Sequence, residues 1–340
     1  MGTHAVHEWF SIPNSIHAGS PAAPQDDPRD PYCSSTRRLA YSGIARKDAQ
    51  IILAATGGHG DYGGNQVTGI DLASDAPGWK LLHAGSPAQK IVPDVPYYPD
   101  GLPVARHTYN QVHFSTTRNR LMLHYSLYVY GSALSFRAAN GFDLDNNQWD
   151  PAGTWSPGMQ ARGRDERDSV WAPTNYRYLN KWDPATDTWT QTGAFANPIY
   201  GPIAHDTARD QLFTLAWGDG TGSGNAINAS KYDARGTTQT PITFTSNAAL
   251  AQFQADTPVD ASMAYDPNGD RFILWDGKSR RLYQVTPNAG TVWTMSIVAT
   301  TGVVPPAASY SHSRMAYVPA LRGCVFMPSG HESLYFVRLS

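Results

Sequence analysis

The feature that most constrains this chain is an internal repeat of short, strand-like segments. Its clearest copy covers residues 262–295, which read SMAYDPNGDRFILWDG, then RLYQVTP after a short link, then TVWTM. Each run is short, rich in β-branched or aromatic residues and bounded by turn residues, which is the pattern of antiparallel strands. This copy therefore predicts a four-stranded antiparallel sheet.

The same frame recurs along the whole sequence. Aligned on the first strand of each copy, the other five copies have their anchor residues at Ala40, His113, Val170, Ala204 and Ala316. The copy at Val170 is the weakest, because its second strand is eroded. The sixth copy ends at YFVRLS without a Trp-marked last strand, and residues 7–13 (HEWFSIP) have the pattern of the missing strand.

These copies predict an all-β fold, a single β-propeller of six four-stranded blades whose last blade is closed by the N-terminal strand. Closure of this kind removes free sheet edges. The expected domain is residues 1–340, with blades at roughly 34–82, 105–150, 164–190, 200–245, 259–296 and 309–340 plus 7–13. Seven blades are the alternative if the insertion at 83–104 contains strands.

Three local motifs carry a resemblance to a known family. They are the Gly-Gly-His at 57–59, the Tyr-Asp-Pro turn at 265–267 and the Trp-marked fourth strand. Together they resemble the kelch or galactose-oxidase-like β-propeller family over nearly the whole chain. The resemblance implies the propeller fold, but it leaves the function open because propellers include lyases, oxidases and interaction scaffolds.

Composition excludes several classes of partner. The net charge is -2 and the pI is near 6.6, so the chain has no basic field for nucleic acid. No apolar run approaches the roughly 20 residues that span a bilayer, and the first residues lack a signal-peptide pattern. A monomer without nucleic-acid or membrane partners is expected. The location stays open, with an extracellular or periplasmic site favoured if a leader has been removed.

The two cysteines allow two states. Cys33 and Cys324 either form one bridge or remain two buried thiols, and the second state is the simpler.

Loop lengths indicate which end of the blades carries the site. The links from one blade to the next are long, whereas turns at the opposite end, such as 266–270, are tight. Long loops on a rigid scaffold commonly hold binding residues. Counting back along each first strand places these candidates at the long-loop end: Arg38, His107, Tyr109, Arg164, Tyr310, His312 and Arg314. The loops between second and third strands add His59, Tyr62 and Asn65.

The candidate side chains suit the breaking of an acidic polysaccharide by β-elimination. That reaction needs a neutralised carboxylate, a base for the α-proton and an acid for the leaving oxygen, and His, Tyr and Arg supply all three. Propeller ulvan lyases look similar in using such a set. The expected catalytic residues are His107 and Tyr109 as the proton-handling pair, Arg314 or Arg38 at the carboxylate, and His59 as a second base or positioner. The expected substrate-binding residues are Arg38, Asn65, Tyr62, Arg164, Tyr310 and His312.

Two other functions compete with the lyase. One is a non-catalytic propeller that binds a glycan or a protein, with tyrosines and tryptophans as stacking surfaces. The minor one is a galactose-oxidase-like copper oxidase, which neither cysteine fits well. No cofactor is expected; a structural Ca or Zn ion between His59, Asp61 and His312 has no spacing motif behind it. The expected partner is an acidic polysaccharide or another glycan.

Overall fold

The computed structural model describes a chain made almost entirely of strands and turns. The described residues are 4–17, 41–57, 62–160, 163–164, 169–174, 178–194, 202–218, 226–233, 238–259, 261–309, 311 and 313–340. Within them lie one α-helix, α1 (Ala248–Asp256), and two 3-10 helices, η1 (Ala88–Lys90) and η2 (Pro319–Leu321). Six sheets, each built on four antiparallel strands, confirm the prediction of an all-β propeller with six blades.

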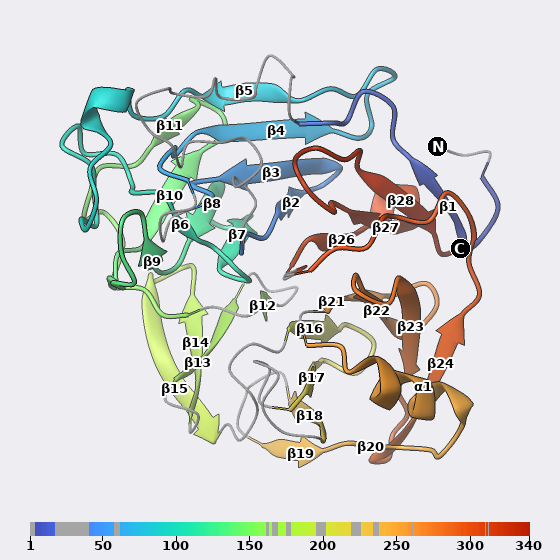
Figure 1. Ribbon diagram of the computed structural model, residues 1–340. Helices are drawn as coiled ribbons and strands as arrows, with labels where there is room; N and C mark the ends of the chain where they lie inside the picture. Colours follow the sequence, from blue (N-terminus) through green and yellow to red (C-terminus); the bar gives the residue numbers. More distant parts are fainter. Residues whose placement is uncertain are drawn as a thin grey trace. The chain divides into compact units, whose positions relative to one another are not determined.

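The chain divides into two compact units (Figure 1). Unit 1 comprises Met1–Ser11, Arg162–Phe326 and Tyr335–Ser340, and unit 2 comprises Ile12–Ala161 and Met327–Leu334. Four of the six sheets belong to unit 1 and two to unit 2.

Unit 2 contains two blades and a small ladder. The first blade consists of β2 (Ala45–Lys47), β3 (Gln50–Ala54), β4 (Val67–Asp71) and β5 (Lys80–His83). The second blade consists of β7 (Val112–Ser115), β8 (Arg120–Leu123), β10 (Asn140–Asp143) and β11 (Gln148–Trp149). The ladder pairs β6 (Arg106–His107) with β9 (Leu127–Val129).

Unit 1 contains the other four blades. The third blade consists of β12 (Gly163–Arg164), β13 (Val170–Thr174), β14 (Tyr178–Asp183) and β15 (Thr188–Ala194). The fourth consists of β16 (Ile203–Asp206), β17 (Gln211–Trp217), β18 (Ile227–Asp233) and β19 (Gln239–Pro241). The fifth consists of β21 (Ser262–Asp266), β22 (Arg271–Asp276), β23 (Arg281–Thr286) and β24 (Val292–Val298), with β20 (Thr243–Phe244) added at its outer edge.

The sixth blade is completed by the N-terminal strand, as the sequence predicted. It consists of β26 (Met315–Val318), β27 (Gly323–Phe326), β28 (Tyr335–Arg338) and β1 (Glu8–Ser11). Strand β1 pairs antiparallel with β28, with Phe10 opposite Phe336. The indole of Trp9 is fully buried and packs on Trp275 of the fifth blade at a centroid distance of 5.0 Å.

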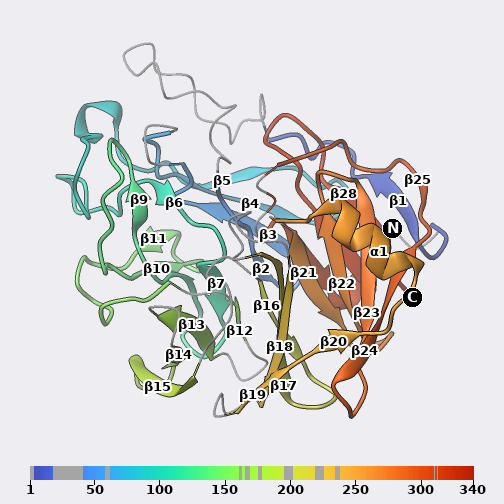
Figure 2. The same ribbon diagram turned by 60° about the horizontal axis from the view of Figure 1, so that its bottom comes forward.

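Two outer edges in unit 1 are covered by short parallel strands. Strand β20 continues from β19 of the fourth blade and pairs with β24 of the fifth. Strand β25 (Thr301–Gly302) follows β24 and pairs with β1 of the sixth blade (Figure 2). Each of these two links therefore also pairs with the outer strand of the next blade. The pairing covers a strand edge that could otherwise pair with another chain.

Neighbouring blades pack face to face through large apolar side chains. Strand β17 is buried along its whole length, because both of its faces lie against other layers. The ring of Phe213 on β17 lies 4.7 Å from that of Phe272 and 4.8 Å from that of Trp293 in the fifth blade. Aromatic contacts of this kind give a core between sheets rather than within one sheet.

Two expectations about the blades are wrong. The insertion at 83–104 holds η1 and an isolated bridge between Tyr97 and Pro103 but no further blade, which excludes the seven-bladed alternative. Residues 170–174 form the second strand of the third blade, not its first, because they pair with both β12 and β14. The first strand of this blade, β12, spans only Gly163–Arg164, so the first clear strand pattern in the sequence is that of the second strand.

Candidate functional site

His107 lies outside the blades, in the β6–β9 ladder of unit 2. Strand β7, the first strand of the second blade, begins only at Val112. Between them, Tyr109 has a left-handed backbone with φ of 40°, which ends the extended run. Counting back along a first strand from its anchor, which puts His107 and Tyr109 on one strand with their side chains on the same side, is therefore wrong here, since alternation holds only along extended backbone.

The ladder is held by a small core of its own. Tyr98 and Val104, from the insertion that precedes β6, are buried together with Val129 of β9. The hydroxyl of Tyr98 donates a hydrogen bond of 2.6 Å to the carbonyl oxygen of Gly63. The long insertion thus fixes the position of the ladder, which fits the general role of long loops as carriers of sites.

Three tyrosines surround His107, and all three have left-handed backbones. The φ angles are 53° at Tyr41, 40° at Tyr109 and 45° at Tyr128. Tyr128 is the extra residue of a β-bulge, since Arg106 pairs with Val129 and His107 with Leu127. A bulky residue in this region is a genuine outlier, and such strained residues cluster at functional sites.

The four rings form a packed cluster, called here the tyrosine–histidine cluster (Tyr41, His107, Tyr109 and Tyr128). The ring of His107 lies 4.6 Å from Tyr41, 5.6 Å from Tyr109 and 5.6 Å from Tyr128, measured between centroids. Nδ1 of His107 lies 3.3 Å from the hydroxyl oxygen of Tyr109. The phenol and the imidazole can exchange a hydrogen bond in either direction, according to the tautomer.

Backbone contacts fix the cluster. The N–H of Tyr109 donates to the carbonyl oxygen of Tyr41 at 2.9 Å. The N–H of Gly43 donates to the hydroxyl of Thr108 at 3.1 Å. These two contacts join segments more than 60 residues apart, so the cluster is a product of tertiary structure.

Burial differs within the cluster. His107 is 2% exposed and Tyr109 is 7% exposed, whereas Tyr41 and Tyr128 are half-buried. The histidine and the tyrosine that touch each other therefore lie behind the two tyrosines that reach solvent. The arrangement provides a proton acceptor and a proton donor in contact, shielded from water.

Arg106 is a buried cation that the sequence analysis did not single out. Its Nε donates to the carbonyl oxygen of Val104 at 3.1 Å, and its Nη1 to that of Ala138 at 3.4 Å. Nη2 has no hydrogen-bond partner among the described residues. Burial lowers the pKa of Arg106 to about 10. In the sequence, the position of Arg106 directly before the candidate His107 was the signal that could have identified it.

Tyr62 and Asn65 are buried residues that hold loops in unit 2. The hydroxyl of Tyr62 donates to Oε1 of Gln66 at 2.8 Å. The side-chain amide of Asn65 donates to the carbonyl oxygen of Pro103 at 2.7 Å and accepts from the N–H of Ser86 at 2.7 Å. Asn65 thus links the loop after β3 to the two ends of the insertion.

Arg314 and Arg164 belong to unit 1. Arg314 is buried and precedes β26 rather than lying within it, because Ser313 has a left-handed backbone with φ of 44°. Its N–H donates to the hydroxyl of Ser262 at 3.2 Å. Arg164 is half-buried in β12. The remaining candidates lie outside the described residues: Arg38, His59, Tyr310 and His312.

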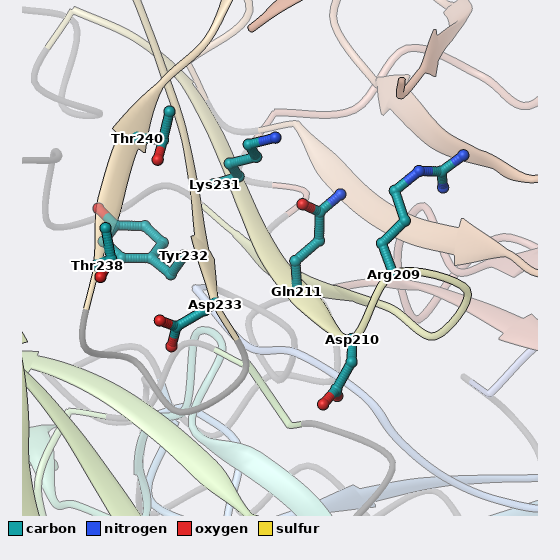
Figure 3. A pocket seen from close by; sticks show the side chains of 8 residues that line it. All are labelled: Arg209, Asp210, Gln211, Lys231, Tyr232, Asp233, Thr238 and Thr240. Carbon is teal, nitrogen blue, oxygen red and sulfur yellow. The ribbon is translucent and has the colours of Figure 1, made fainter. Parts of the chain in front are cut away.

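A polar pocket of about 360 Å³ lies at the tight-turn end of the fourth blade (Figure 3). Its lining consists of Arg209, Asp210, Gln211, Lys231, Tyr232, Asp233, Thr238 and Thr240. In Figure 3 the side chains of Arg209 and Asp210 point away from the other lining groups. Arg209 is bound to Asp206 and Asp270, and Gln211 to Asp206. A ligand site needs convergent polar groups, so this pocket is a weaker candidate than the cluster.

Two further searches gave negative findings for the described part of the chain. It contains no group of three His, Cys, Asp or Glu side chains that could hold a metal ion. None of its helices is long and apolar enough to cross a membrane. Cys324 is a fully buried free thiol, whereas Cys33 lies outside the described residues.

The comparisons with known proteins support the fold alone. No protein-family model matches the sequence, and no curated protein matches it either. Among solved structures, that of YjhT is similar with a TM-score of 0.52 and 9% identity, covering 89% of this chain and 95% of the other. At this identity the similarity concerns the architecture.

Proposed function

We propose that the protein is a carbohydrate-active enzyme that cleaves a uronate-containing polysaccharide by β-elimination. The observation that carries the proposal is the contact of 3.3 Å between His107 Nδ1 and the Tyr109 hydroxyl inside a strained aromatic cluster. The motif resemblance to kelch propellers belongs to the same proposal, together with the similarity to propeller ulvan lyases in using a set of His, Tyr and Arg residues. So do a monomeric state and an extracellular or periplasmic location.

The pair supplies both proton transfers of the elimination. Neutral His107 takes the proton from the carbon next to the uronate carboxylate, and the electron pair of that C–H bond becomes the new C=C bond. The C–O bond to the neighbouring sugar breaks, and the Tyr109 hydroxyl protonates the leaving oxygen. The proton held by His107 then returns to Tyr109 along their contact. Because the two groups touch, the α-hydrogen and the leaving oxygen must lie on the same face of the sugar.

The other candidates fill binding roles in this proposal. Arg38 is proposed to neutralise the carboxylate, which favours the carbanion-like transition state. Arg314, the other candidate, is buried in unit 1 and is not assigned to the site of unit 2. His59 is a second base or a positioner. Arg38, Arg164, Tyr310 and His312 stay proposed substrate-binding residues, whereas Tyr62 and Asn65 are fully buried in contacts that hold loops and are not assigned to binding.

The test is a screen of the full chain against soluble polyuronates: polygalacturonate, alginate, hyaluronan and ulvan. β-Elimination leaves an unsaturated sugar, so the expected result is a rise in ultraviolet absorbance together with new reducing ends. New reducing ends without that absorbance would identify a hydrolase and overturn the proposal. Polysaccharide incubated without protein gives the baseline in each assay.

One observation favours a non-catalytic glycan-binding propeller as the second candidate. His107 is only 2% exposed, so a substrate reaches its ring only if a neighbouring ring moves. A binding protein needs no such movement, because the half-buried tyrosines already offer ring surface. Saturable binding of a glycan that is never cleaved would decide for this candidate.

A further inference from the structure

We infer that Tyr41 and Tyr128 form the surface on which a sugar ring of the ligand stacks, in front of the His107–Tyr109 pair. The inference rests on the proposed function for the substrate class, but not for the chemistry. It assigns the two half-buried members of the tyrosine–histidine cluster to binding and leaves proton transfer to the two buried members.

The order of burial carries the first step. Tyr41 and Tyr128 both contact the ring of His107, at 4.6 Å and 5.6 Å between centroids, and both reach solvent. His107 and Tyr109 are almost completely covered. A ligand that approaches the pair therefore meets the two outer tyrosines first.

The packing of the cluster carries the second step. The centroid distances from His107 and Tyr109 to the other rings of the cluster run from 4.6 to 6.5 Å, which is the spacing of rings in direct contact. No ring-sized gap therefore separates the buried pair from Tyr41 or from Tyr128. A ligand of this site lies against the exposed parts of these two tyrosines.

The backbone carries the third step. A left-handed backbone is unfavourable for a residue that bears a side chain, whereas glycine adopts it freely. Tyr41 has φ of 53° and Tyr128, in its β-bulge, has φ of 45°. Bulges re-aim side chains next to active sites. Both positions suit glycine on conformational grounds, and both carry a large aromatic ring that the cluster displays.

The chemistry of the two residues selects the ligand. A tyrosine ring offers an apolar face with a hydroxyl at its edge, which matches the C–H face and the hydroxyl groups of a pyranose. Such a contact recognises the sugar ring itself, independently of its carboxylate. It therefore predicts that Tyr41 and Tyr128 govern affinity, and not the reacting bond.

The test replaces each outer tyrosine by glycine and by phenylalanine in the full chain. Binding of polygalacturonate and ulvan oligosaccharides is measured by calorimetry in the Tyr109→Phe background, which lacks the hydroxyl needed for cleavage and keeps all four rings of the cluster. Tyr41→Gly and Tyr128→Gly should weaken binding about tenfold or more, whereas the phenylalanine variants should bind within a few-fold of the parent. Tyr178→Ala, at an exposed tyrosine of β14 in unit 1, is the matched control and should bind as the parent does.

Two further readouts separate binding from folding and from chemistry. The glycine variants should lower the melting temperature moderately, because the lost packing of a half-buried ring exceeds the relief of backbone strain, and circular dichroism should show that the fold is kept. In the active background they should raise KM and leave kcat within a few-fold of the parent. Glycine variants that keep both the affinity and the KM of the parent would overturn the inference. Phenylalanine variants that lose as much affinity as the glycine variants would overturn it too.

The outcomes also distinguish this inference from the proposed function. Tyrosine-dependent binding of a glycan that is never cleaved supports the stacking surface and overturns the lyase. Cleavage with a KM that does not depend on Tyr41 or Tyr128 supports the lyase and overturns the stacking surface. Absence of both binding and cleavage for every polyuronate tested overturns both.

Discussion

The hydroxyl oxygen of Tyr109 lies 3.3 Å from Nδ1 of His107, and the chain brings it there through a left-handed backbone at Tyr109. An extended backbone would have placed the two side chains on one side of a strand, about 7 Å apart along it. The bend brings the two groups into contact. The proposed proton transfers depend on this contact.

Loss of either partner should abolish turnover. His107→Ala and Tyr109→Phe should each reduce kcat by about 10² to 10⁴ on the active polyuronate, because each removes one proton-transfer group. Circular dichroism should show an unchanged fold. Tyr125→Phe, at a half-buried tyrosine of the same unit, is the control and should keep kcat. Turnover within a few-fold of the parent in both variants would exclude the pair from catalysis.

Removal of the N-terminal strand should destabilise the protein strongly. Deletion of residues 1–13 exposes the edge of β28 and leaves a hole where Trp9 packs on Trp275. Replacement of a buried tryptophan by alanine alone costs about 3–5 kcal/mol, so Trp9→Ala should lower the urea midpoint clearly. Deletion of residues 1–3, which spares β1, is the control. An unchanged melting temperature after the longer deletion would disprove the role of β1.

A cation between two blades of unit 1 should contribute stability that acid removes. The Arg209 guanidinium contacts both carboxylate oxygens of Asp270 at 2.6 Å and Asp206 at 3.0 Å. Hydrogen bonds from Arg209 lower the pKa of Asp270 to about 2. Since the unfolded carboxyl has a higher pKa, this contribution is complete above roughly pH 4 and is lost as pH falls towards 2.

The size of this contribution is limited by solvent. Asp270 is about half exposed, so the Arg209–Asp270 coupling should be about 1 kcal/mol or less at neutral pH. A double-mutant cycle with Arg209→Met and Asp270→Asn, followed by urea unfolding, measures it. A coupling that persists at a pH near 2 would contradict the assignment.

A buried histidine should make the fold less stable in mild acid. Burial lowers the pKa of His124 well below its ordinary value, with a smaller effect from neighbouring His113. Unfolding restores the ordinary pKa near 6.5, so below that pH the unfolded state binds more protons. Stability should therefore fall as pH drops from about 7.5 to about 5.

His124→Gln should flatten this pH dependence. The control is His331→Gln, at an exposed histidine, which should keep the slope of the parent. Urea midpoints at both pH values give the comparison. Equal slopes in the parent and in His124→Gln would show that another group titrates.

Most of the fold was accessible from the sequence because each blade repeats a local pattern. The turn at 266–270 and the strands on either side are set by neighbours in the chain, and so are their counterparts in other blades. Even the completion of the sixth blade by residues 8–11 could be inferred, since a missing strand at one terminus matched an unpaired one at the other. The third blade was misaligned because its first strand spans only Gly163–Arg164, and so short a run carries no strand pattern in the sequence.

The tyrosine–histidine cluster was accessible only in part. Sequence alone pointed to His107 and Tyr109, because they lie together at the start of a blade. It could not place Tyr41 or Tyr128 beside them, nor show that three tyrosines adopt left-handed backbones. Those conformations cost local free energy and persist only where surrounding contacts outweigh it. Repeated local preferences thus determined the blades, whereas long-range contacts that override such preferences decided the candidate site.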